Sequence, residues 1–306
     1  MRGLVALAPW LLAPLLGCSA TVADDDDDGA EPAPASTQAS VTVERSVTLP
    51  TGDDAMRLST RVMARFIQVS GGIDHEFADR VVGSRRELPA PGSCEWRSST
   101  GLEPLPTVAT SGAIDLLDVG DVILHAGGSS LPLAPRAFPD VGDLVSGVIY
   151  SSRDDSTALP AGESYEIETT GSELADGFRL SIDAPGAPDQ VRIGDEPLDS
   201  EELVIPVGEA LGVQWLAGRD GRDQIVVDLA PWGSDGRQLN AARCSFEDSG
   251  SAIVPEAFVT WSDEVGGLDL SVHRVRRAEL KAPELDEAVV EFDFAVAARL
   301  SVTYEP

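Results

Sequence analysis

Basic and chemically reactive residues are scarce in this chain. Its 306 residues include three Cys, three His and 22 Lys and Arg, against 52 Asp and Glu, which gives a formal net charge of −30. Proteins bind nucleic acid through Lys and Arg that neutralise phosphates, so this charge argues against a nucleic-acid partner. It disfavours anionic lipid headgroups for the same reason. The hydrophobic content of 42% still allows most of the chain to bury a core.

Signatures of catalysis and of cofactor binding are absent as well. The chain has no G-x-S-x-G elbow, no G-x-x-x-x-G-K-[ST] loop and no G-x-G-x-x-G fingerprint. His75-Glu76 begins like a zinc-protease motif, but Asp79 occupies the position of the second His. His125 and His273 lie far away in the sequence, and all three histidines are interpreted as surface or half-buried residues. We therefore expect no catalytic residue, no metal site and no cofactor.

The first eighteen residues form an export signal. A short basic start, Met1-Arg2-Gly3, precedes an apolar stretch at residues 4–16. That stretch is shorter than the roughly 20 residues that cross a membrane. Leu15-Leu16-Gly17-Cys18 resembles the lipobox of bacterial lipoproteins. The resemblance implies cleavage after residues 1–17, acylation of Cys18 and the membrane as a partner through that lipid. Ser19 then favours the outer membrane of the cell envelope over the inner one. An ordinary secretory signal is the alternative.

Residues 18–40 are predicted to be a disordered acidic tether. The segment is rich in Asp, Pro, Ala and Ser and has no apolar periodicity. Asp24, Asp26, Asp28 and Gly29 match the start of an EF-hand calcium loop, but Ala35 stands where the bidentate Glu is required. The run is therefore interpreted as a solvated spacer.

The remaining sequence reads as short strands separated by turns. Residues 73–82 and the turn after Pro255 are candidate short helices. Few other windows have helical periodicity, whereas many alternate or are β-branched between Gly, Pro, Asp and Ser. The predicted strands are 61–69, 122–125, 144–150, 165–169, 178–182, 203–207, 211–216, 224–229, 242–246, 268–275 and 289–296, with 299–304 as a further strand or a continuation of the last.

This pattern predicts an all-β protein with two β-sandwich domains in tandem. Pro185 and Pro188 interrupt the pattern at residues 184–188, so the first domain is placed at residues 41–185 and the second at 186–306. Trp215, inside an alternating run, gives the second half a loose resemblance to immunoglobulin and fibronectin type III domains. The resemblance implies an immunoglobulin-like sandwich, although the Cys…Trp…Cys pattern of true immunoglobulin domains is absent.

A few residues are candidates for binding. Arg274-Val275-Arg276-Arg277 is the one dense basic cluster, either a grip for an acidic partner or the polar face of a strand. Trp96, Trp215, Trp232 and Trp261 are candidates for stacking on sugar rings, with Trp215 read as core and Trp232 placed near a loop. Two copies of Asp-Val-Gly-Asp, at 118–121 and 140–143, are read as tight turns rather than calcium ligands, so no calcium dependence is expected.

Cys94 and Cys244 remain after lipidation of Cys18. Export to an oxidising compartment favours one disulfide between them. The alternative is that each is a small buried hydrophobic residue in its own strand.

These features favour a non-enzymatic envelope lipoprotein that serves as an interaction, adhesion or structural module. Its ligand is an unidentified protein or polysaccharide. The alternative is an envelope hydrolase, for example of glycans, whose site is assembled from residues distant in sequence. Sandwich folds host both classes, so the fold alone does not choose between them.

Overall fold

Strands of alternating sequence make up most of the molecule, which confirms the all-β prediction. The computed structural model describes residues 35–50, 55–84, 86–97, 112–138, 144–153, 157–173, 175–201, 203–261, 265–282 and 285–304. The helical elements within these residues are α1 (His75–Val82) and the 3-10 turn η1 (Glu256–Phe258), both at predicted places. No described helix has the length and apolarity needed to cross a membrane.

Two sheets contain the strands of the described residues. The larger has fourteen strands in the order β3-β15-β14-β17-β18-β1-β2-β4-β7-β6-β5-β8-β9, with β12 beside β18. Their bounds are β1 Ser36–Thr48, β2 Arg57–Val69, β3 Ser93–Arg97, β4 Ile114–Leu116, β5 Val122–Ala126, β6 Ser129–Ala137, β7 Val145–Arg153, β8 Ser164–Thr169, β9 Arg179–Asp183, β12 Val204–Val207, β14 Gln224–Gly233, β15 Ala241–Glu247, β17 Val265–Ala282 and β18 Leu285–Tyr304. The smaller sheet, in the order β11-β10-β13-β16, comprises β10 Arg192–Ile193, β11 Glu196–Pro197, β13 Leu211–Gln214 and β16 Ser251–Val254.

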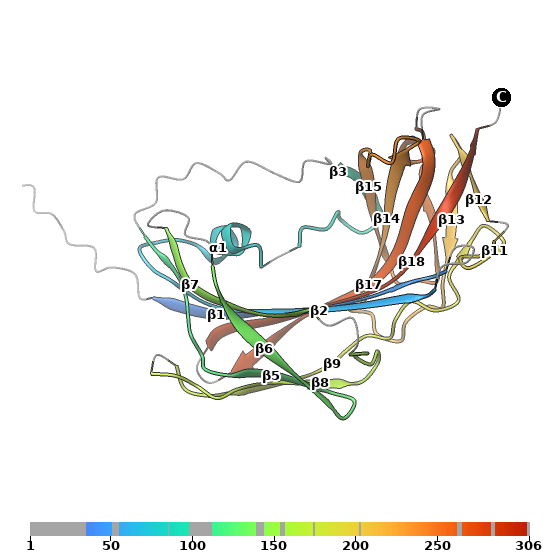
Figure 1. Ribbon diagram of the computed structural model, residues 1–306. Helices are drawn as coiled ribbons and strands as arrows, with labels where there is room; N and C mark the ends of the chain where they lie inside the picture. The colour runs from blue at the N-terminus through green and yellow to red at the C-terminus, as the bar shows by residue number, and fades with distance from the viewer. Residues whose placement is uncertain are drawn as a thin grey trace, which may run out of the picture. The chain divides into compact units, whose positions relative to one another are not determined.

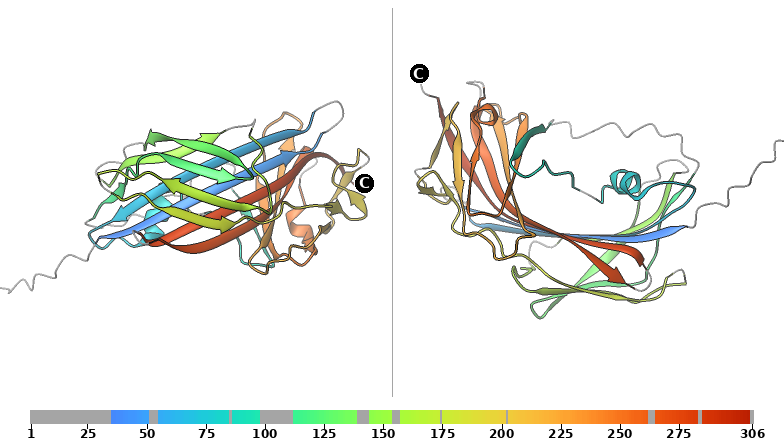
Figure 2. Two further views of the ribbon diagram at one scale, coloured as in Figure 1. Left: turned by 90° about the horizontal axis from the view of Figure 1, so that it is seen from below. Right: turned by 180° about the vertical axis from the view of Figure 1, so that it is seen from behind.

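The two longest strands, β17 and β18, contribute to two separate hydrophobic clusters. Phe292 and Phe294 of β18 belong to the first cluster, and Ala298 and Leu300 of the same strand belong to the second. β1 and β2 lie alongside β18, and the four long strands run side by side (Figures 1 and 2). One continuous run of strands therefore serves both cores.

The first cluster forms because the large sheet folds over at β6. The first half of β6 pairs with β5 and the second half, from Ala134, pairs with β7. This corner turns β5, β8 and β9 toward β1, β2 and β18 (Figure 1). Phe66, Tyr150 and Phe178 meet edge to face between these layers, at ring separations of 5.6 to 5.8 Å. The arrangement is a sandwich made from one sheet.

The second cluster lies between the small sheet and the far part of the large one. Val213 of β13 and Val254 of β16 pack with residues of β14, β15, β17 and β18. Trp215, predicted to be core, is only 5% exposed, and its indole N–H donates to the Asp248 carboxylate at 2.6 Å. This is a second sandwich, whose small sheet is separate from the large one.

The observed strands extend and supplement the predicted set. Each of the eleven predicted strands overlaps an observed one, and β18 runs unbroken through residues 299–304. β1, however, begins at Ser36, so the end of the predicted tether is part of the sheet. Gln38 and Ala39 are buried because β1 is held between β2 and β18. The rest of the tether, and Cys18, lie outside the described residues.

The predicted boundary falls where the chain passes from one cluster to the other. Ala184 belongs to the first cluster and Val191 to the second. The large sheet nevertheless continues through both, and residues 33–306 belong to one compact unit. The division into two domains stays a prediction.

Arg274 and Arg276 hold this connecting segment to β17. The Arg274 guanidinium donates to Asp248 at 2.7 Å and to the backbone carbonyls of Gly186, Ala187 and Leu216 at 3.2, 3.0 and 2.6 Å. Arg276 forms a two-point contact with Asp223 at 2.6 and 2.9 Å and donates to the Asp183 carbonyl. Both side chains are buried, so neither is the exposed grip for an acidic partner that the sequence suggested.

Replacing Arg274 should therefore destabilise the fold strongly. Arg274→Ala leaves the Asp248 carboxylate buried without its cation, which typically costs 3–5 kcal/mol. The matched control is Arg237→Ala, because Arg237 forms an exposed 3.8 Å pair with Asp235 that contributes about 1 kcal/mol or less. Urea unfolding measures the free energy of unfolding of both variants. Equal midpoints for the two variants would contradict this account of the connecting segment.

Candidate binding groove

On the side away from the two clusters, β1, β17 and β18 present a largely polar face, whereas Ile67 and Val69 of β2 form a third cluster with Ala78 and Val82 of α1. Side chains alternate across a strand, so Val41 and Val43 point into the first cluster while Thr42 and Glu44 point away from it. Thr42 of β1, Glu291 of β18 and Arg277 of β17 lie in one cross-strand row. Charged side chains therefore lie on the face of the large sheet that points away from the two clusters.

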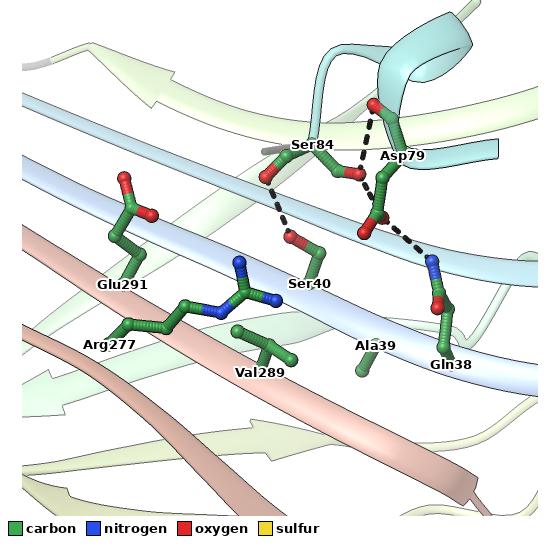
Figure 3. A pocket seen from close by; sticks show the side chains of 8 residues that line it. All are labelled: Gln38, Ala39, Ser40, Asp79, Ser84, Arg277, Val289 and Glu291. Atoms are coloured by element: carbon green, nitrogen blue, oxygen red, sulfur yellow. Dashed lines mark hydrogen bonds between the residues drawn. The ribbon is translucent and has the colours of Figure 1, made fainter. Parts of the chain in front are cut away.

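Helix α1 and the residues after it cover part of this face (Figure 1). The Asp74 side chain caps the first turn by accepting from the Phe77 N–H, and Gly83 ends the helix at φ 66°. On the helix, Asp79 accepts from the Gln38 amide of β1 at 2.8 Å. The Ser40 hydroxyl donates to the Ser84 carbonyl (Figure 3). These contacts fix the helix on the sheet.

Residues 86–97 continue from the helix to β3 and enclose a groove of about 1170 Å³. That is somewhat larger than the 300–1,000 Å³ typical of small-ligand pockets and suits an extended ligand. The lining residues are Glu76, Arg80, Arg86, Glu87, Leu88, Pro89, Ala90, Pro91, Glu95, Trp96, Arg97, Arg222, Gln224, Arg243, Val275, Arg277 and Glu291.

The groove reverses the charge balance of the chain. Six arginines and four glutamates line it, whereas acidic residues outnumber basic ones by 52 to 22 overall. Arg86 pairs with Glu44 at 2.8 Å and with Asp293, and Arg243 makes a two-point contact with Asp228 at 2.7 and 2.5 Å. Part of the positive charge is therefore neutralised inside the wall.

Two of these arginines remain unpaired within the part of the chain that the structure describes. Arg97 and Arg277 have neither an ion pair nor a side-chain hydrogen bond there, although Glu291 lies opposite Arg277 in register. Burial, and then repulsion from Arg243, lower the pKa of Arg97. An anion beside Arg97 would relieve both effects.

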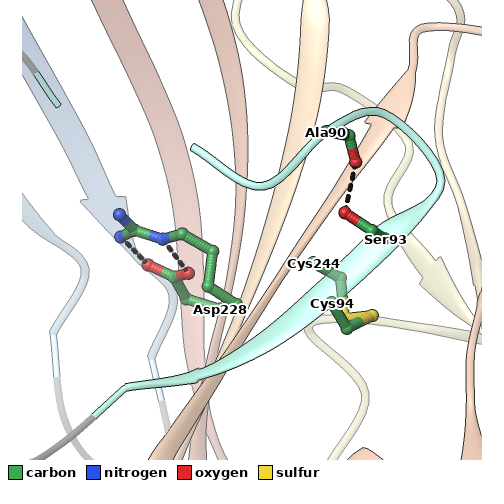
Figure 4. The surroundings of a disulfide bond; sticks show 6 residues. Ala90, Ser93, Cys94, Asp228 and Cys244 are labelled. Atoms are coloured by element: carbon green, nitrogen blue, oxygen red, sulfur yellow. Dashed lines mark hydrogen bonds and ion pairs between the residues drawn. A yellow bond between two sulfur atoms is a disulfide. The ribbon is translucent and has the colours of Figure 1, made fainter. Parts of the chain in front are cut away.

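A disulfide fixes the strand that forms the groove edge. Cys94 of β3 and Cys244 of β15 are bonded, with an S–S distance of 2.01 Å, and are direct partners in the sheet (Figure 4). The next residues of β3, Glu95 and Trp96, line the groove. Trp96 is 46% exposed, and its ring centroid lies 5.3 Å from that of Phe258. Trp96 borders the groove, but it alternates with Arg97 along β3, so its ring packs toward Phe258 on the side of the second cluster.

Ser271, His273 and Asp293 form a hydrogen-bonded relay on the same face, next to the groove; Asp293 is buried and the other two are half-buried. His273 Nδ1 lies 2.7 Å from Asp293 and Nε2 lies 2.8 Å from the Ser271 hydroxyl. Burial lowers the His273 pKa to about 4, with Asp228 opposing that shift and Arg86 adding to it. The neutral ring therefore donates to the Asp293 carboxylate and accepts from Ser271. None of the three is among the residues that line the groove.

The other candidates from the sequence are placed elsewhere. Trp232 and Trp261 are half-buried, and among the described tryptophans Trp96 is the exposed one. Asp118 accepts from the Gly120 N–H and the Tyr150 hydroxyl, and its pKa is lowered by these bonds, as expected for a turn. The second Asp-Val-Gly-Asp copy, at residues 140–143, lies outside the described residues.

Comparisons with known proteins identify no family. No family model and no curated protein matches the chain. Similar solved structures include the yeast delta-COP-I mu-homology domain, at 10% identity and a TM-score of 0.25 over 89% of this chain and 99% of that one. The same domain complexed with Dsl1 WxWxV peptide gives 11% identity and a TM-score of 0.26 over 90% and 98%.

A further similar structure comprises the FN1–FN3 domains of chicken CNTN1. It has 9% identity and a TM-score of 0.20 over 85% of this chain and 99% of that one. This is a weak structural resemblance to fibronectin type III domains. At such scores none of these likenesses carries an argument about function.

The relay makes stability depend on pH through His273. Its pKa is 6.5 in the unfolded chain and about 4 when folded, so the folded form binds fewer protons between these values. Stability is therefore complete above pH 6.5 and falls by roughly 3 kcal/mol as the pH drops to about 4. Urea unfolding across this range should show a slope to which His273 contributes nearly one proton, in addition to carboxylates such as Asp228 whose pKa values are also lowered. His273→Gln should lower the slope between pH 5 and 6.5 by most of that contribution, whereas the control His125→Gln should not; an unchanged slope in His273→Gln contradicts the assignment.

Proposed function

We propose that this protein is a lipid-anchored envelope module whose groove binds an acidic polysaccharide. The observation that carries the proposal is the six arginines gathered in one groove of a chain with a net charge of −30. Arginines gathered in one groove attract a negatively charged ligand to it. The rest of the acidic surface would repel the same molecule, which confines binding to the groove.

Arg97 and Arg277 match the chemistry of an acidic sugar chain. A guanidinium donates two parallel hydrogen bonds to a carboxylate, and both arginines have that capacity free within the described residues. The groove also has polar walls, as hydroxyl-rich ligands require.

A polysaccharide fits these features better than a protein ligand. Protein interfaces obtain most of their binding energy from buried aromatic and aliphatic anchors in a desolvated centre. Eleven of the seventeen lining residues are charged or polar, and the apolar ones are Leu88, Pro89, Ala90, Pro91, Trp96 and Val275. An acidic peptide remains the competing ligand for the test.

Binding of oligogalacturonate should depend on the two unpaired arginines. We expect Arg97→Ala and Arg277→Ala each to weaken affinity about tenfold or more, because a charged hydrogen bond contributes about 1.5–3 kcal/mol. Arg136→Ala is the matched control, since Arg136 is an exposed arginine of β6 outside the groove. Isothermal titration calorimetry measures the affinities, which should fall as salt rises.

Two further ligands make this experiment decisive. A neutral maltooligosaccharide of equal length should not bind. Poly-glutamate binding in place of oligogalacturonate would show a peptide groove and overturn the glycan proposal. Equal loss in Arg136→Ala would also overturn it, since the effect would then be one of overall charge.

The anchor is the second part of the proposal. The match at Leu15-Leu16-Gly17-Cys18 supports lipidation of Cys18, and the acidic residues after it support a spacer between membrane and body. Ser19 supports the outer membrane.

Cys18→Ser should abolish membrane retention. Without the thiol no thioether lipid is added, so the body is released or an uncleaved precursor accumulates. Cell fractionation and the intact mass of the mature protein measure this outcome. Wild-type protein that is soluble and carries no acyl mass on Cys18 would refute the anchor and leave groove binding untouched.

The hydrolase alternative rests on Ser271, His273 and Asp293. Their hydrogen bonds follow the nucleophile, base and orienting-carboxylate order of a serine triad. Asp293 is also held by Arg86, and the trio lies off the groove lining. Release of new reducing ends from oligogalacturonate by wild type, and its loss in Ser271→Ala, would establish this alternative.

A further inference from the structure

A histidine and two glutamates gather on the outer face of β5 and β8, apart from the groove. His125 lies directly opposite Glu166 in the antiparallel register, and Glu168 is two residues along the same strand. Their neighbours Leu124 and Ile167 point into the first cluster. Alternation therefore turns His125, Glu166 and Glu168 to the other face, from adjacent positions on rigid strands.

The three side chains are spaced for a single ion. One ligand atom from each lies within 4.8 Å of the others, and His125 Nε2 is 3.2 Å from a Glu168 oxygen. Zinc binds imidazole nitrogen and carboxylate oxygen at about 2.0–2.2 Å, so two ligands of one ion lie roughly 3–4 Å apart. Small rotations of the glutamates suffice to close the site.

A neighbouring hydroxyl orients the histidine. His125 Nδ1 lies 2.8 Å from the Ser130 hydroxyl of β6. A contact of this kind on the second ring nitrogen fixes the ring plane and leaves Nε2 directed at the carboxylates. All three ligand side chains are half-buried, which limits the rotamer freedom lost on binding.

Arg179 of β9 is the cation that neutralises the carboxylates. It lies 2.7 Å from Glu168 and 3.5 Å from Glu166, and its own side chain is 61% exposed. An exposed ion pair of this kind contributes little to stability, so a divalent ion can displace it. The carboxylates therefore prefer a positive partner at this point, and Arg179 competes for that place.

We propose that His125, Glu166 and Glu168 bind a divalent transition-metal ion of the zinc type. The imidazole selects this class over calcium, which takes six to eight oxygen ligands. The proposal agrees with the expected absence of calcium dependence and departs from the expectation of no metal site. Three protein ligands leave at least one position for water, and the ion joins β5 to β8.

Zinc titration of the untagged, EDTA-treated protein tests the site. Calorimetry should show saturable binding of one Zn²⁺, and the melting temperature should rise with zinc because the ion binds the folded form. His125→Ala and Glu168→Gln should lose saturable binding. Ser130→Ala should weaken it about tenfold, the usual effect of removing an orienting contact.

Arg179→Gln provides the discriminating variant. It should strengthen zinc binding, because the competing cation is gone, whereas a merely structural role for the cluster predicts no gain. His75→Ala is the control, since His75 contacts Ser36 on β1, away from β5 and β8. Absence of saturable binding in wild type, or equal loss in His75→Ala and His125→Ala, would overturn the proposal; melting without zinc shows whether each variant folds.

Discussion

Pairing of β17 with β18 is the interaction on which the rest of the structure depends. The two strands pair antiparallel from Leu268 opposite Leu300 to Ala282 opposite Leu285. Along that length one face supplies apolar residues to both clusters, and the other face carries Glu291, Asp293 and Arg277. A register slip of one residue would exchange the two faces and place these charges in the cores. The register is therefore fixed by burial at both ends.

Local sequence predicted most strands because period-two alternation is visible within five or six residues. The predicted strands do not include β1, β3, β4, β6, β10, β11 and β16. In β3, a short run of Ser93, Cys94 and Glu95 becomes a strand by pairing with β15. Local sequence placed Ser36 in the tether for the same reason, since a polar segment acquires its structure from the strands on both sides. Pairing between distant residues is not encoded in local composition.

The candidate sites show the same limit more sharply. Arg274 and Arg276 formed a visible basic cluster, yet burial against residues 183–187 makes them part of the framework. Conversely, Arg97 and Arg277 are far apart in sequence, and only the fold brings them to one groove. No signal in the sequence singled out Arg97. Alternation alone would have placed Arg277 on the opposite face from Arg276, and so away from the core.

The position of β1 has a consequence for how the chain folds. β1 is parallel to β18, and Gln38 pairs with Glu287, almost the full length of the body away. Parallel pairing over such a separation closes a very large loop, which slows folding.

Until the last strand is made, one edge of β1 exposes unpaired N–H and C=O groups, the kind of edge that promotes aggregation. Because Phe292 and Phe294 of β18 belong to the first cluster, that core cannot close before β18 is made, and its apolar residues stay exposed until then.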